Sequence, residues 1–169
     1  MGMSLAPDYL ITGLPRMRSA WLSAVLSTPD LPCVHDRATA GLVDYKHGLS
    51  DPMVSCVAPA AMVKVTYRQP LPVVIIDRNP EEAFASLCAM ADRADLDIDR
   101  REWESLVREH LWFRERVPQA MVVPYDLLND SYVVQSIGAA VGVSLSIPHI
   151  DRFQRLYIEQ HVKCLRSAS

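Results

Sequence analysis

Short apolar runs alternate along this chain with stretches of helical periodicity. Four of the runs are only a few residues long and predict buried strands at residues 9–12, 32–35, 73–77 and 121–124. A further run at residues 62–67 fits a strand or a helix equally well. The alternation predicts an α/β fold, with a parallel sheet flanked by helices in a single domain over residues 1–169.

Helix signals follow most of these runs. Asn79 is a good N-cap and Pro80 suits the first helical position, so a helix is expected to start there. Four more helices are predicted at residues 19–26, 99–117, 131–142 and 150–165. The segment 38–61 shows no clear period, and we expect it to be a substrate loop or lid.

The charge balance limits the classes of ligand. The net charge is −3 and the isoelectric point is about 5.9, so the basic footprint of a nucleic-acid binder is missing. We expect no nucleic-acid polymer as partner, and any anion site must be a local concentration of arginine.

Cysteine spacing and hydropathy suggest a reducing compartment. Cys33, Cys56, Cys88 and Cys164 form no Cys-x-x-Cys pair, so no metal site is expected. No signal peptide and no membrane-spanning apolar run is recognised, which predicts a cytoplasmic protein without a membrane partner.

The first candidate site is the turn that follows the first predicted strand. The strand stops at Gly13, and Arg16, Arg18 and Ser19 lie in the turn before a helix. Backbone N–H groups and the positive end of a helix dipole meet at such a turn, and the guanidiniums add charge. The pattern suits a phosphate or a sulfate, although surface arginines in an ordinary turn explain it equally well. It lacks the lysine of a Walker motif.

The second candidate site is Arg78 with Ser86. Arg78 comes directly after the strand at residues 73–77, and Ser86 follows eight residues later in the next helix. Carboxyl ends of parallel strands are where ligands bind in open α/β sheets. The alternative is an ordinary ion pair of Arg78 and an uninvolved helix serine.

Together the two segments resemble the sulfotransferases. The run Gly13-Leu-Pro-Arg-Met-Arg-Ser-Ala-Trp-Leu22 is similar to the 5′-phosphosulfate loop of that family, especially in a small bacterial and phage branch. Arg78 and Ser86 match the 3′-phosphate motif, and the stretch at residues 121–128 followed by Val141-Gly142 is similar to a later strand and helix end. The resemblance covers roughly residues 8–143.

The resemblance implies a three-layer P-loop-like fold and a specific donor. The donor is 3′-phosphoadenosine-5′-phosphosulfate (PAPS), its product is 3′,5′-diphosphoadenosine, and no metal is needed. The acceptor is a small molecule or saccharide with a hydroxyl or amine. Arg16 would also act in catalysis, and Arg78 and Ser86 would hold the 3′-phosphate. The residues implied in holding the 5′-phosphosulfate are Leu14, Pro15, Arg16, Met17, Arg18, Ser19, Ala20 and Trp21.

The resemblance also suggests a catalytic base. Some sulfotransferases carry a glutamate at the end of the second strand, where this chain has His35 and Asp36. Neighbours on a strand point to opposite faces, so one of the two is expected to face the cleft. Asp36 is the first choice and His35 the second. In the alternative, His35 is a core histidine and Asp36 caps a turn.

Departures from the family pattern keep other functions open. Met17 stands where the family has serine, Arg18 where it has glycine, and Ala20 where it has a second hydroxyl residue. The glycine-rich segment that covers the nucleotide is missing. A nucleotide-binding or structural protein that retains the fold without activity is one alternative. A nucleotide-dependent kinase of the P-loop type is another, and the missing Walker lysine argues against it.

Overall fold

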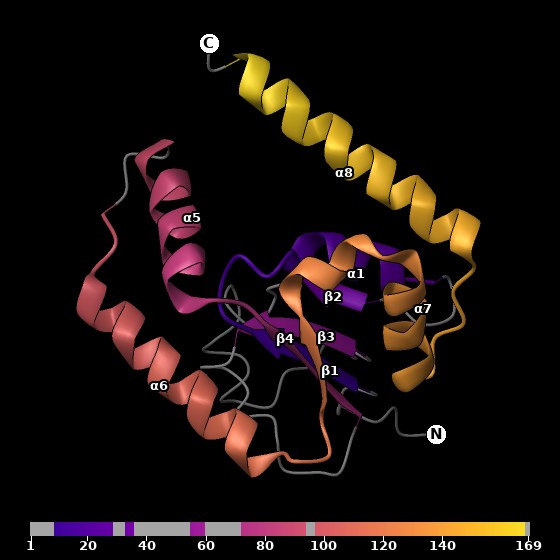
Figure 1. The fold of residues 1–169 in the computed structure, drawn as a ribbon, viewed down its shortest axis with the longest axis horizontal. Helices are drawn as coiled ribbons and strands as arrows, with labels where there is room; N and C mark the ends of the chain where they lie inside the picture. The colour runs from indigo at the N-terminus through magenta and orange to yellow at the C-terminus, as the bar shows by residue number, and fades with distance from the viewer. Residues whose placement is uncertain (1–8, 29–32, 36–54, 60–71, 94–96, 168–169) are drawn as a thin grey trace, which may run out of the picture.

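A parallel sheet forms the centre of the molecule. The computed structural model describes residues 9–28, 33–35, 55–59, 72–93 and 97–167 (Figure 1). Within these residues five strands pair in the order β2-β3-β1-β4-β5, and every pairing is parallel. The strands are β1 (Tyr9–Gly13), β2 (Cys33–His35), β3 (Ser55–Pro59), β4 (Val73–Asp77) and β5 (Met121–Pro124). The predicted α/β class and the parallel sheet flanked by helices are confirmed.

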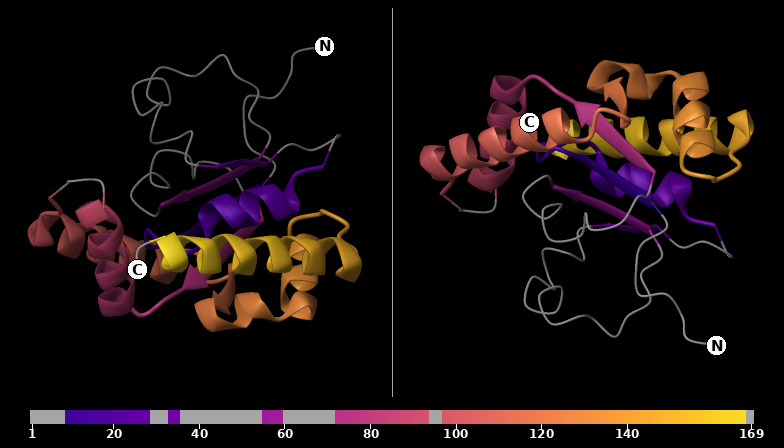
Figure 2. Two further views of the ribbon diagram at one scale, coloured as in Figure 1. Left: turned by 90° about the horizontal axis from the view of Figure 1, so that it is seen from above. Right: turned by 90° about the horizontal axis from the view of Figure 1, so that it is seen from below.

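The first group of helices covers one face of the sheet. They are α1 (Ser19–Leu26), α7 (Ser131–Ala140) and α8 (Ile147–Ser167). Alternate residues of β1 and β4 point into this layer. The core there contains Tyr9, Ile11, Val74, Ile76, Leu22, Val25, Val134, Ile137 and Ile150. Two views of the ribbon show α8 running beside α1 across this layer (Figures 1 and 2).

The second group of helices follows β4. These are α5 (Pro80–Arg93) and α6 (Arg100–Arg116), which contact each other through the rings of Phe84 and Trp103, 5.5 Å apart between centroids. Leu14, from the turn after β1, is buried with Trp103 and Ala83. The turn after β1 is therefore packed into the hydrophobic cluster of these two helices.

Capping residues fix three helix starts where the sequence predicts them. The side-chain oxygen of Asn79 accepts from the backbone N–H groups of Glu81 and Glu82. Asp99 and Asp130 cap α6 and α7 in the same way, through the N–H groups of Arg101 and Tyr132. These contacts satisfy donors that the first helical turn leaves without partners.

The structure corrects the expectation for residues 38–61. β3 lies within this segment and pairs with both β1 and β2. The strand sequence, Ser-Cys-Val-Ala-Pro, contains one β-branched residue and ends in proline, so it gives little strand signal. The remaining residues of that segment, and the ambiguous run at 62–67, lie outside the described residues.

Two smaller differences concern the C-terminal third. α8 begins at Ile147, three residues before the predicted start, because Pro148 is tolerated in the first helical turn. A 3-10 helix, η1 (Tyr125–Asn129), follows β5 directly and was not predicted.

Candidate anion-binding site at the ends of β1 and β4

The order of the strands places β1 and β4 at a point where the chain connections diverge. From β1 the chain passes through α1 toward β2, on one side of β1, whereas from β4 it continues to β5 on the opposite side. A crevice outside the carboxyl ends of two such neighbouring strands is the usual ligand site in open α/β sheets. Both candidate motifs of the sequence follow these two strands.

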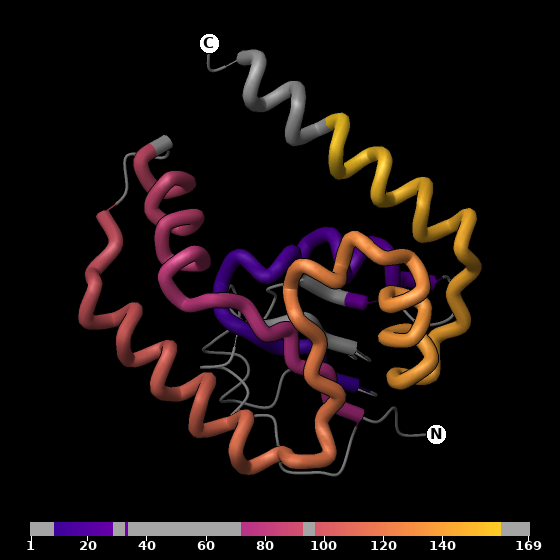
Figure 3. Tube along the Cα trace, viewed as in Figure 1, coloured from indigo at the N-terminus to yellow at the C-terminus, as the bar shows by residue number. Residues whose placement is uncertain are grey.

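The turn between β1 and α1 has an unusual backbone. Arg16 and Arg18 have φ angles of 72° and 62°, in the left-handed region that residues other than glycine rarely adopt. The Cα trace shows the chain reversing through this turn into α1 (Figure 3). Such strain is found where surrounding contacts over-determine the conformation, often at ligand sites.

Gly13 lets the turn approach β4 closely. A Cβ atom at Gly13 would lie 2.6 Å from the carbonyl oxygen of Ile76 and 2.7 Å from the sulfur of Met17. Both distances are shorter than van der Waals contact. The glycine is therefore required by the packing of the turn against the neighbouring strand.

Three of the predicted site residues meet at this point. The Nε of Arg16 donates to the hydroxyl of Ser86 at 3.3 Å. Arg78 donates through Nη1 to the backbone carbonyl of Arg16. The turn motif and the Arg78–Ser86 motif, separated by about seventy residues in the chain, thus form one cluster.

The cluster concentrates positive charge beside an aromatic ring. The guanidinium of Arg78 lies 4.1 Å from the ring centroid of Tyr125, and its buried Nε has no hydrogen-bond partner among the described residues. Asp77, the residue before Arg78, pairs instead with Arg114 at 3.0 Å. That carboxylate therefore does not neutralise Arg78 by a direct ion pair.

Arg18 makes its contacts with a different set of residues. Its Nη2 donates to the side-chain oxygen of Asn129 at 2.8 Å. Its guanidinium lies 4.5 Å from the ring centroid of Tyr157, 5.4 Å from that of Tyr125 and 5.8 Å from that of Trp21. We call Trp21, Tyr125, Tyr157 and Asn129 the Arg18 cage. Sequence reasoning assigned no role to Tyr125, Asn129 or Tyr157, and only the tyrosine in the later strand motif gave any signal.

The other turn residues differ in exposure. Met17 is only 1% exposed and belongs to the main core, so only its backbone is open to a ligand. Trp21 is also buried, and its indole N–H donates to the carbonyl of Phe153 at 3.2 Å. Pro15 and Ser19 are partly buried, and Ala20 is exposed.

Of the two candidate bases, only the backbone of His35 is described, at an edge of the sheet. His35 is the last residue of β2, and β3 separates β2 from β1. The side chain of His35 and the whole of Asp36 lie outside the described residues. The choice between Asp36 and His35 therefore stays a prediction.

His110 on α6 is a buried titratable group near this site. It is 2% exposed, and in the part of the chain that the structure describes neither ring nitrogen has a hydrogen-bond partner. Burial lowers its pKa below the usual value, the Asp77 carboxylate opposes that shift, and Arg114 adds to it. His110 is therefore part of the buried face of α6.

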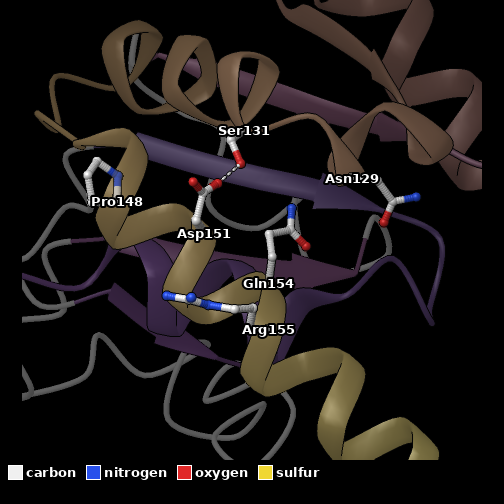
Figure 4. A pocket seen from close by; sticks show the side chains of 6 residues that line it. All are labelled: Asn129, Ser131, Pro148, Asp151, Gln154 and Arg155. Atoms are coloured by element: carbon white, nitrogen blue, oxygen red, sulfur yellow. Dashed lines mark hydrogen bonds between the residues drawn. The ribbon is translucent and has the colours of Figure 1, made fainter.

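A polar groove lies next to the Arg18 cage, between α8 and the start of α7. It has a volume of about 490 Å³ and is lined by Asn129, Ser131, Pro148, Asp151, Gln154 and Arg155 (Figure 4). Several of these groups already have partners, since Ser131 donates to Asp151 and Gln154 donates to the carbonyl of Leu128 at 2.6 Å.

Comparison with known proteins does not identify a family. No protein-family model matches the chain, and no curated protein matches its sequence. In the part of the chain that the structure describes, no group of three metal-ligating side chains gathers. No helix among the same residues is long and apolar enough to cross a membrane.

Proposed function

We propose that this chain is a small sulfotransferase that uses PAPS as donor. The observation that carries the proposal is the cluster of Arg16, Arg78 and Ser86 at the carboxyl ends of two neighbouring parallel strands. Each of the two sequence motifs alone has an ordinary structural explanation. Their convergence at a topological switch point favours a ligand with two separate anionic groups.

The proposed roles follow from the positions of the side chains. Backbone N–H groups of the turn, the start of α1 and Arg16 hold the 5′-phosphosulfate. Arg78 and Ser86 hold the 3′-phosphate. The sulfur–oxygen bond to the phosphate breaks as a bond to the acceptor oxygen or nitrogen forms. The acceptor proton passes to Asp36 or His35, and 3′,5′-diphosphoadenosine leaves.

Electrostatic stabilisation accounts for most of the catalysis in this proposal. The transferred group and the leaving phosphate carry spread negative charge, as in phosphoryl transfer. Fixed guanidiniums and backbone N–H groups can stabilise that charge without reorganising during the reaction. Arg16, which is exposed at the turn, is the side chain best placed to do so.

One observation favours the non-enzymatic alternative. Met17 is buried and Arg18 is engaged in its cage, so two side chains of the turn do not reach its open side. A protein that binds the nucleotide without transferring sulfate would need only the remaining groups.

Calorimetric titration tests which nucleotide the protein binds. We expect 3′,5′-diphosphoadenosine to bind and ATP to bind much more weakly, because the site has two anion positions and no Walker lysine. Arg16→Ala should reduce the affinity, and Arg101→Ala, which removes an exposed arginine of α6, serves as the matched control. Equal affinity for both nucleotides, or no binding, would contradict the proposal.

An assay with labelled PAPS then distinguishes a sulfotransferase from a protein that only binds the nucleotide. Transfer of label to a panel of hydroxyl and amine acceptors supports the enzyme. Binding of 3′,5′-diphosphoadenosine with no transfer to any acceptor supports the non-enzymatic alternative.

A further inference from the structure

Arg18 combines features that a direct anion ligand does not need. It is the N-cap residue of α1 and has a left-handed backbone, and its guanidinium, which has no acceptor, cannot cap the N–H groups of the helix. Its guanidinium is instead surrounded by three aromatic rings and is bonded to Asn129. A cation among aromatic faces is stabilised by the ring quadrupoles, most strongly where water is excluded.

Most donors of Arg18 are not available to a ligand in this arrangement. Nη2 donates to Asn129, and among the described residues both Nε and Nη1 are buried without a hydrogen-bond partner. Buried N–H groups that face rings cannot bind an anion unless the cage opens. Arg16 has the opposite environment, because its side chain is exposed at the turn.

The cage joins the turn to elements from the other end of the chain. Tyr125 and Asn129 belong to η1, and Tyr157 belongs to α8. Trp21 fixes α1 to α8 through its bond to the carbonyl of Phe153. Arg18 is thus the side chain through which the turn contacts both η1 and α8.

We infer that Arg18 is a positioning residue for the anion-binding turn. This inference rests on the proposed function, since the turn is positioned for the 5′-phosphosulfate. The cage holds the guanidinium, and the guanidinium holds the backbone of residue 18 in its left-handed conformation. That conformation orients the N–H groups at the start of α1 toward the anion.

The inference predicts that residues away from the anion control its affinity. Asn129→Ala removes one charge-assisted hydrogen bond of Arg18 and leaves every side chain of the turn in place. We expect it to weaken the binding of inorganic sulfate at the turn about fivefold to tenfold. Gln154→Ala is the matched control, because it removes a hydrogen bond to the same 3-10 helix without touching Arg18.

A double-mutant cycle with Arg18→Ala makes the test specific. If Asn129 acts through Arg18, Asn129→Ala has no further effect on sulfate affinity once Arg18 is replaced. Arg18→Lys keeps the charge but loses the planar fork, so it should behave like Arg18→Ala. If Arg18 instead bound sulfate directly through its charge, Arg18→Lys would keep most of the sulfate affinity. If Arg18→Ala does not fold, Arg18→Gly replaces it, since glycine adopts the left-handed conformation freely.

Amide chemical shifts of residues 13–22, followed during a titration with inorganic sulfate, give the readout. The inference is supported if sulfate causes the chemical-shift changes of the turn with lower affinity in Asn129→Ala but not in Gln154→Ala. This result supports it even if no nucleotide binds and the proposed function fails. Additive effects of Asn129→Ala and Arg18→Ala, a loss of melting temperature without a loss of affinity, or no response of the turn to sulfate would each overturn it.

Discussion

Arg78 donates a hydrogen bond to the backbone carbonyl oxygen of Arg16, across the ends of two neighbouring strands. The contact fixes the turn after β1 to the residue that follows β4. The Arg78 guanidinium, which we propose to bind the 3′-phosphate, therefore contacts the turn that we propose to bind the 5′-phosphosulfate. The two proposed anion positions are therefore adjacent.

The first prediction is that Arg78→Ala discriminates between nucleotides. A lost charge-assisted contact is worth about 1.5–3 kcal/mol, so the affinity for 3′,5′-diphosphoadenosine should fall roughly tenfold or more. Adenosine 5′-phosphosulfate, which has no 3′-phosphate, should lose much less. Calorimetric titration of both ligands measures the difference, and equal losses would remove Arg78 from the 3′-phosphate position.

The second prediction concerns two of the three turn positions, Met17 and Ala20, at which the chain departs from the sulfotransferase pattern. Met17→Ser should lower the free energy of unfolding by about 2–5 kcal/mol, because it truncates a buried side chain. Ala20→Ser lies on the exposed side of α1 and should change stability by less than about 0.5 kcal/mol. Urea unfolding compares them. A stable Met17→Ser with improved sulfate affinity would show that the side chain at 17 reaches the ligand.

The third prediction uses two glycines with different constraints. Gly13→Ala should destabilise the protein by at least about 1–3 kcal/mol, because the new methyl group would collide with a backbone oxygen and the Met17 sulfur. Gly142 has a φ of 78° and open space around it, so Gly142→Ala should cost only the left-handed strain, about 1–2 kcal/mol. Gly13→Ala alone should also weaken sulfate binding at the turn.

The fourth prediction is a pH dependence of stability from His110. Burial lowers the pKa of His110 in the folded protein, so the unfolded chain binds the proton more readily. The contribution of His110 to the free energy of unfolding should therefore be complete above about pH 6.5 and should be lost as the pH falls below that value. The difference between wild type and His110→Leu in urea unfolding at pH 5 to 8 isolates this effect from other groups. A difference that is constant over this range would contradict the prediction.

The sequence by itself determined the local features of this protein. The caps at Asn79, Asp99 and Asp130, the apolar run of β1 and the start of α1 all depend on residues a few positions apart. Hydrophobic periodicity and side-chain caps act over that range, so a single sequence carries enough information to predict them. The same reasoning selected Arg16, Arg78 and Ser86 as candidates.

Only the tertiary structure decided which of these candidates meet. The order of the strands brings β1 beside β4 and leaves β2, with His35 at its end, at an edge of the sheet. β3 was missed because Ser-Cys-Val-Ala-Pro has little strand propensity, whereas its pairing with β1 and β2 depends on residues far away in the chain. Arg18 was predicted to hold an anion, but its side chain turns to rings of η1 and α8, more than a hundred residues away. Such contacts depend on the packing of distant segments, which no local pattern in the sequence encodes.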